Sequence, residues 1–175
     1  MGQANSSKVN NSETKYDELI RKWAGKYGLH PAFVKAIIKA ESSFNPLAYR
    51  AEPALQDASY GLMQILFATA KGIGYQGHPD GLYEPELNIQ FGTKYLGLQL
   101  RRFGSEELAA AAYNAGPGFV SRLVEKHGNS FTAIFDHLPA VTRKYVPRVM
   151  GYYAEFRRGG QGAGKIETKE AKTKI

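Results

Sequence analysis

Apolar side chains recur along most of this chain at intervals of three and four residues, which is the spacing of one face of an α-helix. The first such stripe ends at Gly28, a residue suited to the left-handed conformation that closes many helices. The alternation with a period of two that is typical of strands extends over only a few residues at a time. The pattern therefore predicts a mainly α fold.

The segment between the second and third expected helices lacks this periodicity. Residues 46–57 include Pro53, and we expect a long loop or a short hairpin there. Ser105 is placed to cap a helix, and the alanines at 109–112 would let neighbouring backbones approach that helix closely. The expected helices are 14–27, Pro31 through Glu41, Gly61 through Ala70, 86–103, 105–114, 117–126 and 145–157.

The two ends of the chain differ from its middle in composition. Residues 1–14 and 159–175 are polar, Gly-rich or Lys-rich, with too few large apolar groups to offset the entropy of ordering. We therefore predict a disordered leader, one folded domain over 15–158 and a disordered basic tail. With 175 residues and 43% hydrophobic content, the chain suffices for one domain with a core, and we expect a monomer.

The charge balance is basic, with 23 Lys and Arg against 16 Asp and Glu. Such an excess attracts anionic partners in general. No RNA-binding signature, zinc-finger spacing or basic zipper is present, so we expect no nucleic-acid partner. No stretch approaches the roughly 18 to 20 apolar residues of a membrane span, so none is expected.

The sequence lacks the motifs of most classes of catalytic site. The chain has no cysteine, and its four histidines show no spacing typical of metal ligands, so we expect no metal and no cofactor. The Gly-x-Ser-x-Gly motif of serine hydrolases and the phosphate-binding P-loop are absent as well. Carboxylate chemistry remains.

Glu41 is the candidate acid. Val34, Ile37 and Ile38 form the apolar stripe of the second helix, and Glu41 takes the next position of that stripe. A carboxyl on an apolar face is desolvated, and desolvation raises its pKa towards that of a general acid. The pattern alone is equally compatible with an ion pair to Arg50 that only stabilises the fold.

Three short blocks resemble those of the soluble lytic transglycosylase family, in the same order and at similar spacing. The resemblance covers about residues 16–153 and implies a lysozyme-like, goose-type helical domain whose cleft binds the glycan strands of peptidoglycan. The blocks are Glu41-Ser42-Ser43-Phe44-Asn45-Pro46, Gly61-Leu62-Met63-Gln64-Ile65 and Ala112-Tyr113-Asn114-Ala115-Gly116-Pro117-Gly118.

Position by position, the resemblance implies that Glu41 is the catalytic acid and base. The other positions that it implies, all as substrate-binding residues, are Ser42, Ser59, Met63, Gln64, Tyr113, Asn114 and Tyr145. Ser59 is assigned within a segment that is longer here than in the family. Near the C-terminus the chain has Pro139-Ala140-Val141-Thr142, where Val141 replaces a glutamate that is frequent in the family.

The resemblance implies cleavage between N-acetylmuramic acid and N-acetylglucosamine, with a 1,6-anhydro product and no water consumed, outside the cytoplasm. A hydrolytic muramidase, in which Glu52 or Asp57 positions a water molecule, is the first alternative. A glycan-binding domain without catalysis is the second.

Overall fold

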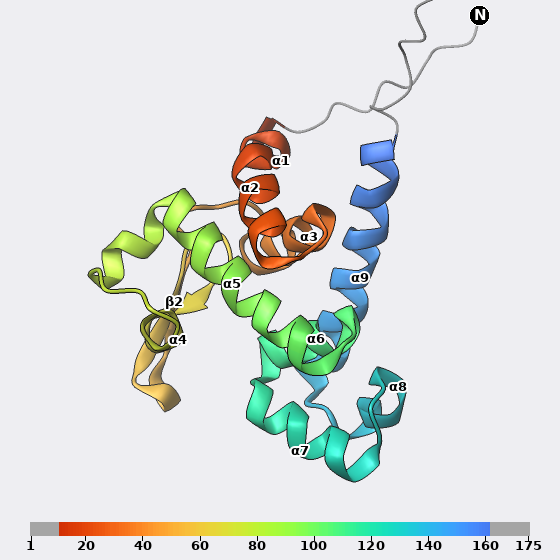
Figure 1. Ribbon diagram of the computed structural model, residues 1–175. Coiled ribbons are helices and arrows are strands. Elements are labelled where there is room, and N and C mark those ends of the chain that lie inside the picture. The colour runs from red at the N-terminus through yellow and green to blue at the C-terminus, as the bar shows by residue number, and fades with distance from the viewer. Residues whose placement is uncertain (1–10, 162–175) are drawn as a thin grey trace, which may run out of the picture.

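The computed structural model describes residues 11–161, and helices dominate it, as the apolar spacing predicts (Figure 1). The α-helices are α1 (Asn11–Thr14), α2 (Asp17–Tyr27), α3 (Pro31–Ser42), α4 (Phe67–Gly72), α5 (Pro85–Phe103), α6 (Glu106–Ala115), α7 (Pro117–His127), α8 (Phe131–Ile134) and α9 (Ala140–Gln161). Three short 3₁₀ helices lie at Pro53–Leu55, Pro79–Tyr83 and Phe135–His137.

Helix α6 lies at the centre of the larger core. Its four consecutive alanines, Ala109 to Ala112, have no exposed surface, and α5, α7 and α9 all pack against it. Small side chains on every face of α6 permit these close approaches, as the alanine run predicts. Helices α3 and α9 also pack extensively on each other. The last described helix therefore lies against the helix that carries Glu41.

Several helix ends follow the capping residues predicted from sequence. Gly28 ends α2 in the left-handed conformation with φ of 73°, and Gly104 ends α5 in the same way with φ of 70°. The hydroxyl of Ser105 accepts a hydrogen bond from the backbone N–H of Leu108 at the start of α6. Pro31 and Pro117 open α3 and α7, where a proline loses no helical hydrogen bond.

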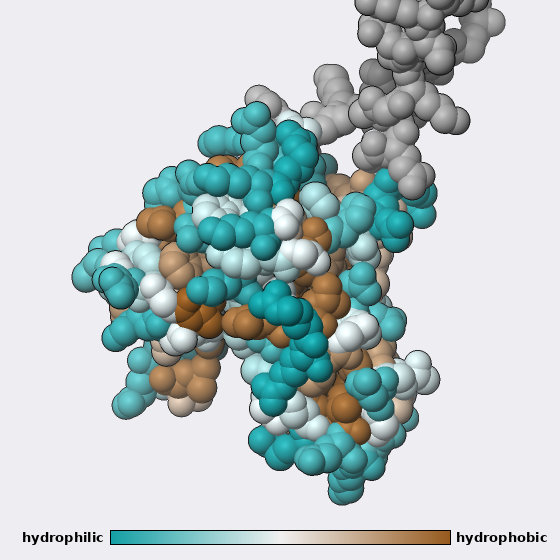
Figure 2. Space-filling view, in the orientation of Figure 1, coloured by the Kyte–Doolittle hydropathy of each residue, from teal (hydrophilic) through white to brown (hydrophobic). Residues whose placement is uncertain are grey.

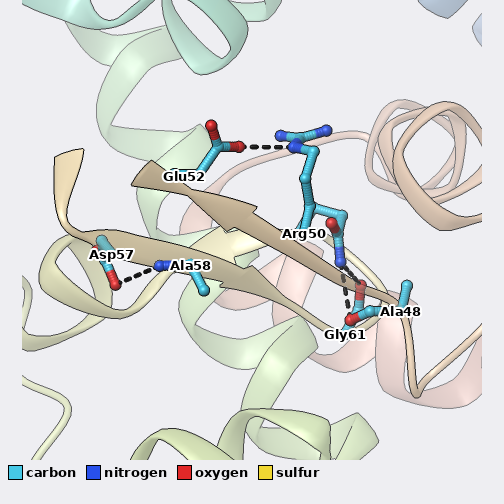
Figure 3. Close-up of polar contacts among 7 residues, drawn as sticks. Ala48, Arg50, Glu52, Asp57, Ala58 and Gly61 are labelled. Carbon is cyan, nitrogen blue, oxygen red and sulfur yellow. Dashed lines mark hydrogen bonds and ion pairs between the residues drawn. The ribbon is translucent and has the colours of Figure 1, made fainter. Parts of the chain in front are cut away.

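The aperiodic segment after α3 forms the short hairpin that was one of the two expected outcomes. Strands β1 (Tyr49–Glu52), β2 (Asp57–Tyr60) and β3 (Ile65–Leu66) make an antiparallel sheet in that order. Arg50 lies opposite Ser59, and the N–H of Gly61 donates to the carbonyl of Ala48 at the base of the hairpin (Figure 3). The hairpin and α4 together form a lobe beside the helical core.

The helix expected from Gly61 through Ala70 is wrong over its first half. Gly61 has φ of 70° and Gln64 has φ of 46°, and neither is compatible with a right-handed helix. The segment is a tight turn that leads into β3, and helix α4 begins only at Phe67. The apolar side chains of Met63 and Leu66 have helical spacing in the sequence but belong to the turn and the strand.

The described ends also differ from the predicted boundaries. Residues 1–10 and 162–175, most of the expected leader and tail, lie outside the described residues. Asn11–Thr14 forms α1, and Glu13 pairs with Lys39 at 3.0 Å. The last helix begins at Ala140 rather than at residue 145 and includes Pro147 in its interior, and α8 was not anticipated.

Candidate active site

Glu41 occupies the last turn of α3, and its carboxylate faces the start of α9. The hydroxyl of Tyr145 donates a hydrogen bond of 2.7 Å to Oε1 of Glu41. Ser43 then adopts φ of 50° and Phe44 φ of 65°, so the chain leaves the helix sharply just after the acid. The sharp exit sends the following residues away into the hairpin and leaves the largely buried Glu41 carboxylate facing α9.

Burial raises the pKa of Glu41 above its ordinary value, as its place on the apolar stripe predicts. The hydrogen bond from Tyr145 and the positive charges of Arg50 and Arg148 act in the opposite direction, and the charge of Glu52 raises the pKa slightly further. The position of Glu41 near the negative C-terminal end of α3 also favours the neutral acid. The net effect is a raised pKa, so Glu41 keeps its proton to a higher pH than an exposed glutamate does.

The ion pair that offered a purely structural explanation for Glu41 is not formed. Nε of Arg50 contacts Oε1 of Glu52 at 2.6 Å along β1, so its hydrogen bond stays within the hairpin (Figure 3). Arg50 therefore influences Glu41 through its charge alone. The hydroxyl of Tyr145 is the hydrogen-bond partner of the carboxylate instead.

Tyr113 and Asn114 project from the last turn of α6. The hydroxyl of Tyr113 donates to the carbonyl of Met63 at 2.8 Å, which ties α6 to the turn before β3. Burial, followed by the charge of Glu41, raises the pKa of Tyr113 well above its ordinary value, so the phenol remains a hydrogen-bond donor. Oδ1 of Asn114 accepts a 2.7 Å hydrogen bond from the hydroxyl of Thr142.

The turn that carries Met63 and Gln64 is held by a residue that the sequence did not single out. Asn88, in α5, is fully buried; its Oδ1 accepts from the N–H of Met63, and its Nδ2 donates to the carbonyls of Tyr60 and Leu82. The first bond is made to the turn itself, and the other two join the end of β2 and the 3₁₀ helix Pro79–Tyr83 to the same side chain, so that these backbone groups are paired. Asn88 thereby holds the turn in place.

Two of the predicted substrate-binding residues contribute little or no accessible surface. The Met63 side chain is fully buried against Gly92, so only its backbone carbonyl reaches the site, through Tyr113. Ser59 is 1% exposed within β2. Both placements follow from the inward-facing side of the turn and the sheet, and neither side chain is available to a sugar.

Two other predicted residues lie at the site with their hydrogen bonds directed partly inward. Nε2 of Gln64 donates to the carbonyls of Ala48 and Gly61, which leaves the oxygen of the amide as the group that can face a ligand. The hydroxyl of Ser42 donates to the carbonyl of Leu62 at 2.7 Å. Ser42 therefore joins the end of α3 to the turn, next to the acid.

A groove of about 280 Å³ lies between the hairpin lobe and the end of α6. Figure 2 shows this face of the molecule hollowed between the lobe that holds the strands and α4 and the lobe that holds α7 and α8. Its lining residues are Leu55, Gln64, Ile65, Leu66, Thr69, Tyr95, Tyr113, Asn114, Ala115 and Gly116. The groove therefore contains both polar groups and aromatic side chains, the combination that suits a sugar ligand.

Two further properties bear on the kind of site. Among the residues described here, no three His, Asp or Glu side chains are grouped closely enough to hold a metal ion. None of the helices between residues 11 and 161 combines the length and the hydropathy that crossing a bilayer would need.

The fold and these residues define a lysozyme-like domain of the lytic transglycosylase kind. The sequence model of the family described as "Transglycosylase SLT domain" matches residues 18–135, and the chain belongs to this family.

Curated relatives bear the corresponding names. The soluble lytic murein transglycosylase of Salmonella typhimurium is 33% identical over 153 residues, an alignment that covers 81% of this chain and 23% of that protein. The membrane-bound lytic murein transglycosylase C of Yersinia pestis is 32% identical over 173 residues, covering 82% of this chain and 47% of its own length. The matched part of this chain therefore spans 23% and 47% of the length of these two relatives.

Solved structures agree with the sequence comparison. An inactive mutant of the lytic transglycosylase Slt of Pseudomonas aeruginosa superposes with a TM-score of 0.74 and 29% identity, over 85% of this chain and 25% of that one. The 70 kDa soluble lytic transglycosylase of Escherichia coli gives a TM-score of 0.72 and 31% identity, over 83% and 24% of the two chains. The predicted lysozyme-like fold is confirmed.

Proposed function

We propose that this domain is a peptidoglycan lytic transglycosylase in which Glu41 acts first as general acid and then as general base. The observation that carries the proposal is the state of Glu41: a carboxyl whose pKa is raised by burial, whose Oε1 is held by Tyr145, and whose charge acts on Tyr113 in the wall of the groove. A neutral acid in that position can give a proton to a glycosidic oxygen.

In the first step the Glu41 proton passes to the oxygen between N-acetylmuramic acid and N-acetylglucosamine, and the bond from C1 of the muramoyl sugar to that oxygen breaks. The carbonyl oxygen of the N-acetyl group stabilises the positive charge at C1. In the second step the 6-hydroxyl of the same sugar bonds to C1 and gives its proton to Glu41. The enzyme is restored, and the product is a 1,6-anhydro sugar.

The carboxylates nearest the hairpin support one catalytic acid rather than two. Oδ1 of Asp57 accepts from the N–H of Ala58, and its Oδ2 accepts from the N–H of Ala68, so both oxygens serve the backbone. Glu52 is engaged with Arg50. Hydrolytic glycosidases of the usual two-carboxylate type need a second acid that activates water or attacks the sugar. The intramolecular 6-hydroxyl removes that need, with the advantage of an attached nucleophile.

The remaining site residues receive roles from their contacts. Tyr145 orients the Glu41 carboxylate, Tyr113 and Ser42 hold the turn beside it, and Gln64 and Asn114 present polar atoms to the N-acetyl groups of the glycan. The basic balance of the chain, 23 against 16, favours a substrate with peptide carboxylates and anionic wall polymers. We place its action outside the cytoplasm, where murein is found.

Mass spectrometry of purified murein digested by the domain tests the proposal. We expect 1,6-anhydromuropeptides, and we expect none from Glu41→Gln. Glu52→Gln and Asp57→Asn serve as matched controls, each removing one carboxylate near the hairpin, and both should still give anhydro products. Reducing-end products would identify a hydrolytic muramidase instead, and binding of murein without cleavage would identify a glycan-binding domain.

A further inference from the structure

Thr142 is a buried polar residue that the proposed reaction does not use. Its side chain has no exposed surface, and it lies in the first turn of α9, one turn before Tyr145. The hydroxyl donates a 2.7 Å hydrogen bond to Oδ1 of Asn114, 28 residues earlier in the chain. A buried hydroxyl with one directed bond to a residue of the groove suggests a role in setting that residue's orientation.

The direction of this bond follows from the position of Thr142 in the helix. A threonine within a helix often donates to the carbonyl four residues earlier. For Thr142 that residue is Leu138, which is extended (φ −79°, ψ 150°) and precedes α9. In the first turn of a helix the unpaired backbone groups are N–H donors rather than carbonyls. The hydroxyl hydrogen is therefore directed to Asn114, where Oδ1 accepts it.

An asparagine side chain has one acceptor and one donor end, and the bond from Thr142 occupies the acceptor. The amide nitrogen, Nδ2, is then the end that remains for the groove, which Asn114 lines together with Tyr113 and Gln64. Gln64 is held the other way round: its Nε2 donates to Ala48 and Gly61, and its oxygen remains. The groove is thus offered one amide donor and one amide acceptor, in fixed places.

We propose that Thr142 is a positioning residue that fixes Asn114 with its amide N–H groups towards the groove, where they donate to the acetamido carbonyl oxygen of an N-acetylated sugar. This inference rests on the proposed glycan substrate. It adds an explanation of which end of the Asn114 amide, donor or acceptor, faces the sugar. A flipped Asn114 would turn its oxygen towards the sugar carbonyl, and two acceptors repel each other. Without the hydroxyl of Thr142 both orientations would become populated.

Calorimetric binding of tetra-N-acetylchitotetraose tests the proposal without any turnover, on the Glu41→Gln background. Asn114→Ala and Asn114→Asp should each weaken binding about tenfold, the usual effect of one lost hydrogen bond. The aspartate keeps the acceptor for Thr142 and removes the donor. Thr142→Val should weaken binding about three- to tenfold, while Thr142→Ser, which retains the hydroxyl, should stay within about twofold. Thr132→Val, a change of an exposed threonine in α8, is the control.

A double substitution separates positioning from general damage. On the Asn114→Ala background, Thr142→Val should have no further effect on affinity, because the residue that it orients is gone. An additional loss there, or an Asn114→Asp variant that binds as the parent does, would overturn the proposal. The two proposals can be separated. If the wild-type domain released no anhydromuropeptides but the variants showed the expected affinities, the proposed reaction would be wrong, whereas the proposed orientation of Asn114 would be supported.

Discussion

Tyr145 and Glu41 are 104 residues apart in the chain, and the hydroxyl of Tyr145 lies 2.7 Å from Oε1 of Glu41. The bond joins the first turns of α9 to the last turn of α3. It restrains the acid and lowers its pKa, while burial raises that pKa by the larger effect. A single phenol thus sets both the orientation of the Glu41 carboxyl and part of its acidity.

Tyr145→Phe should raise the pKa of Glu41, because it removes a hydrogen bond that stabilises the anion. The proposed reaction requires a protonated Glu41 in the free enzyme, so the high-pH limb of kcat/KM should move to higher pH. We also expect kcat to fall about tenfold or more, since the carboxyl loses its orienting partner. The pH dependence of muropeptide release measures both effects.

Tyr152→Phe is the control for this change, because Tyr152 is on the same helix and its ring lies under Lys39, away from the groove. An unchanged pH profile in Tyr145→Phe would contradict the assigned hydrogen bond.

Glu41→Gln should make the folded domain more stable at neutral pH, by about 1 kcal/mol, the common size of one stabilising substitution. Because the folded-state pKa of Glu41 is raised, the native state binds more protons than the unfolded chain as pH rises above about 4. Wild-type stability therefore falls through the window between the unfolded and the raised folded pKa, whereas the amide has no such dependence.

Denaturant melts of both proteins at several pH values check this prediction. The two curves should converge at acidic pH, below the ordinary pKa of glutamate, where Glu41 is protonated in both states. The quantity to compare is the free energy of unfolding of Glu41→Gln minus that of wild type. A smaller difference at neutral pH than at acidic pH would contradict the prediction.

Arg50 and Glu52 should shift the activity profile in opposite directions. The charge of Arg50 lowers the pKa of Glu41, and that of Glu52 raises it. Arg50→Gln should therefore move the high-pH limb of kcat/KM upwards, and Glu52→Gln should move it downwards. Both side chains are partly exposed, so raising the salt concentration should reduce each shift. Shifts of the same sign in the two variants would exclude a purely electrostatic effect.

The stability of the turn before β3 should depend on two residues, Asn88, whose buried side-chain amide contacts the turn, and Gly61. Asn88→Ala leaves three backbone groups without a partner and should cost about 2 to 4 kcal/mol in the free energy of unfolding. Gly61→Ala should also destabilise, because a Cβ would overlap Asn88 and the carbonyl of Leu82 in a left-handed backbone.

Gly25→Ala provides the matched control. Gly25 lies in the interior of α2 with nothing near its hypothetical Cβ, so this change should stabilise the domain by about 0.5 to 1 kcal/mol. Thermal unfolding followed by circular dichroism ranks the three variants. A neutral Asn88→Ala would show that the turn forms without its amide.

The features that the sequence predicts well are those that depend on neighbours in the chain. Helical periodicity located α2, α5 and α7, with Gly28 marking the end of α2, and the same periodicity identified Glu41 as an acid on an apolar face. The turn at Gly61 was mistaken for a helix, since Met63, Leu66 and Ala70 satisfy helical spacing while the backbone at Gln64 does not.

Local sequence patterns do not predict contacts between residues that are far apart in the chain. Asn88 contacts Met63, 25 residues away, and Thr142 contacts Asn114, 28 residues away. Nothing in the local spacing distinguishes either residue from an ordinary polar side chain. Tyr113, Asn114 and Tyr145 were predicted as site residues from the family resemblance, which carries information on tertiary contacts that single-sequence periodicity lacks.

Helix α9 lies outside residues 18–135, the part matched by the family model. A fragment cut at that boundary would keep Glu41, Gln64 and Tyr113 and would lose the side chains that hold the acid and Asn114. Among the described helices α9 is made last, so a nascent chain that has not yet reached it would carry Glu41 without Tyr145. The proposed cleavage of glycan strands would then become possible only after α9 has docked on α3 and α6.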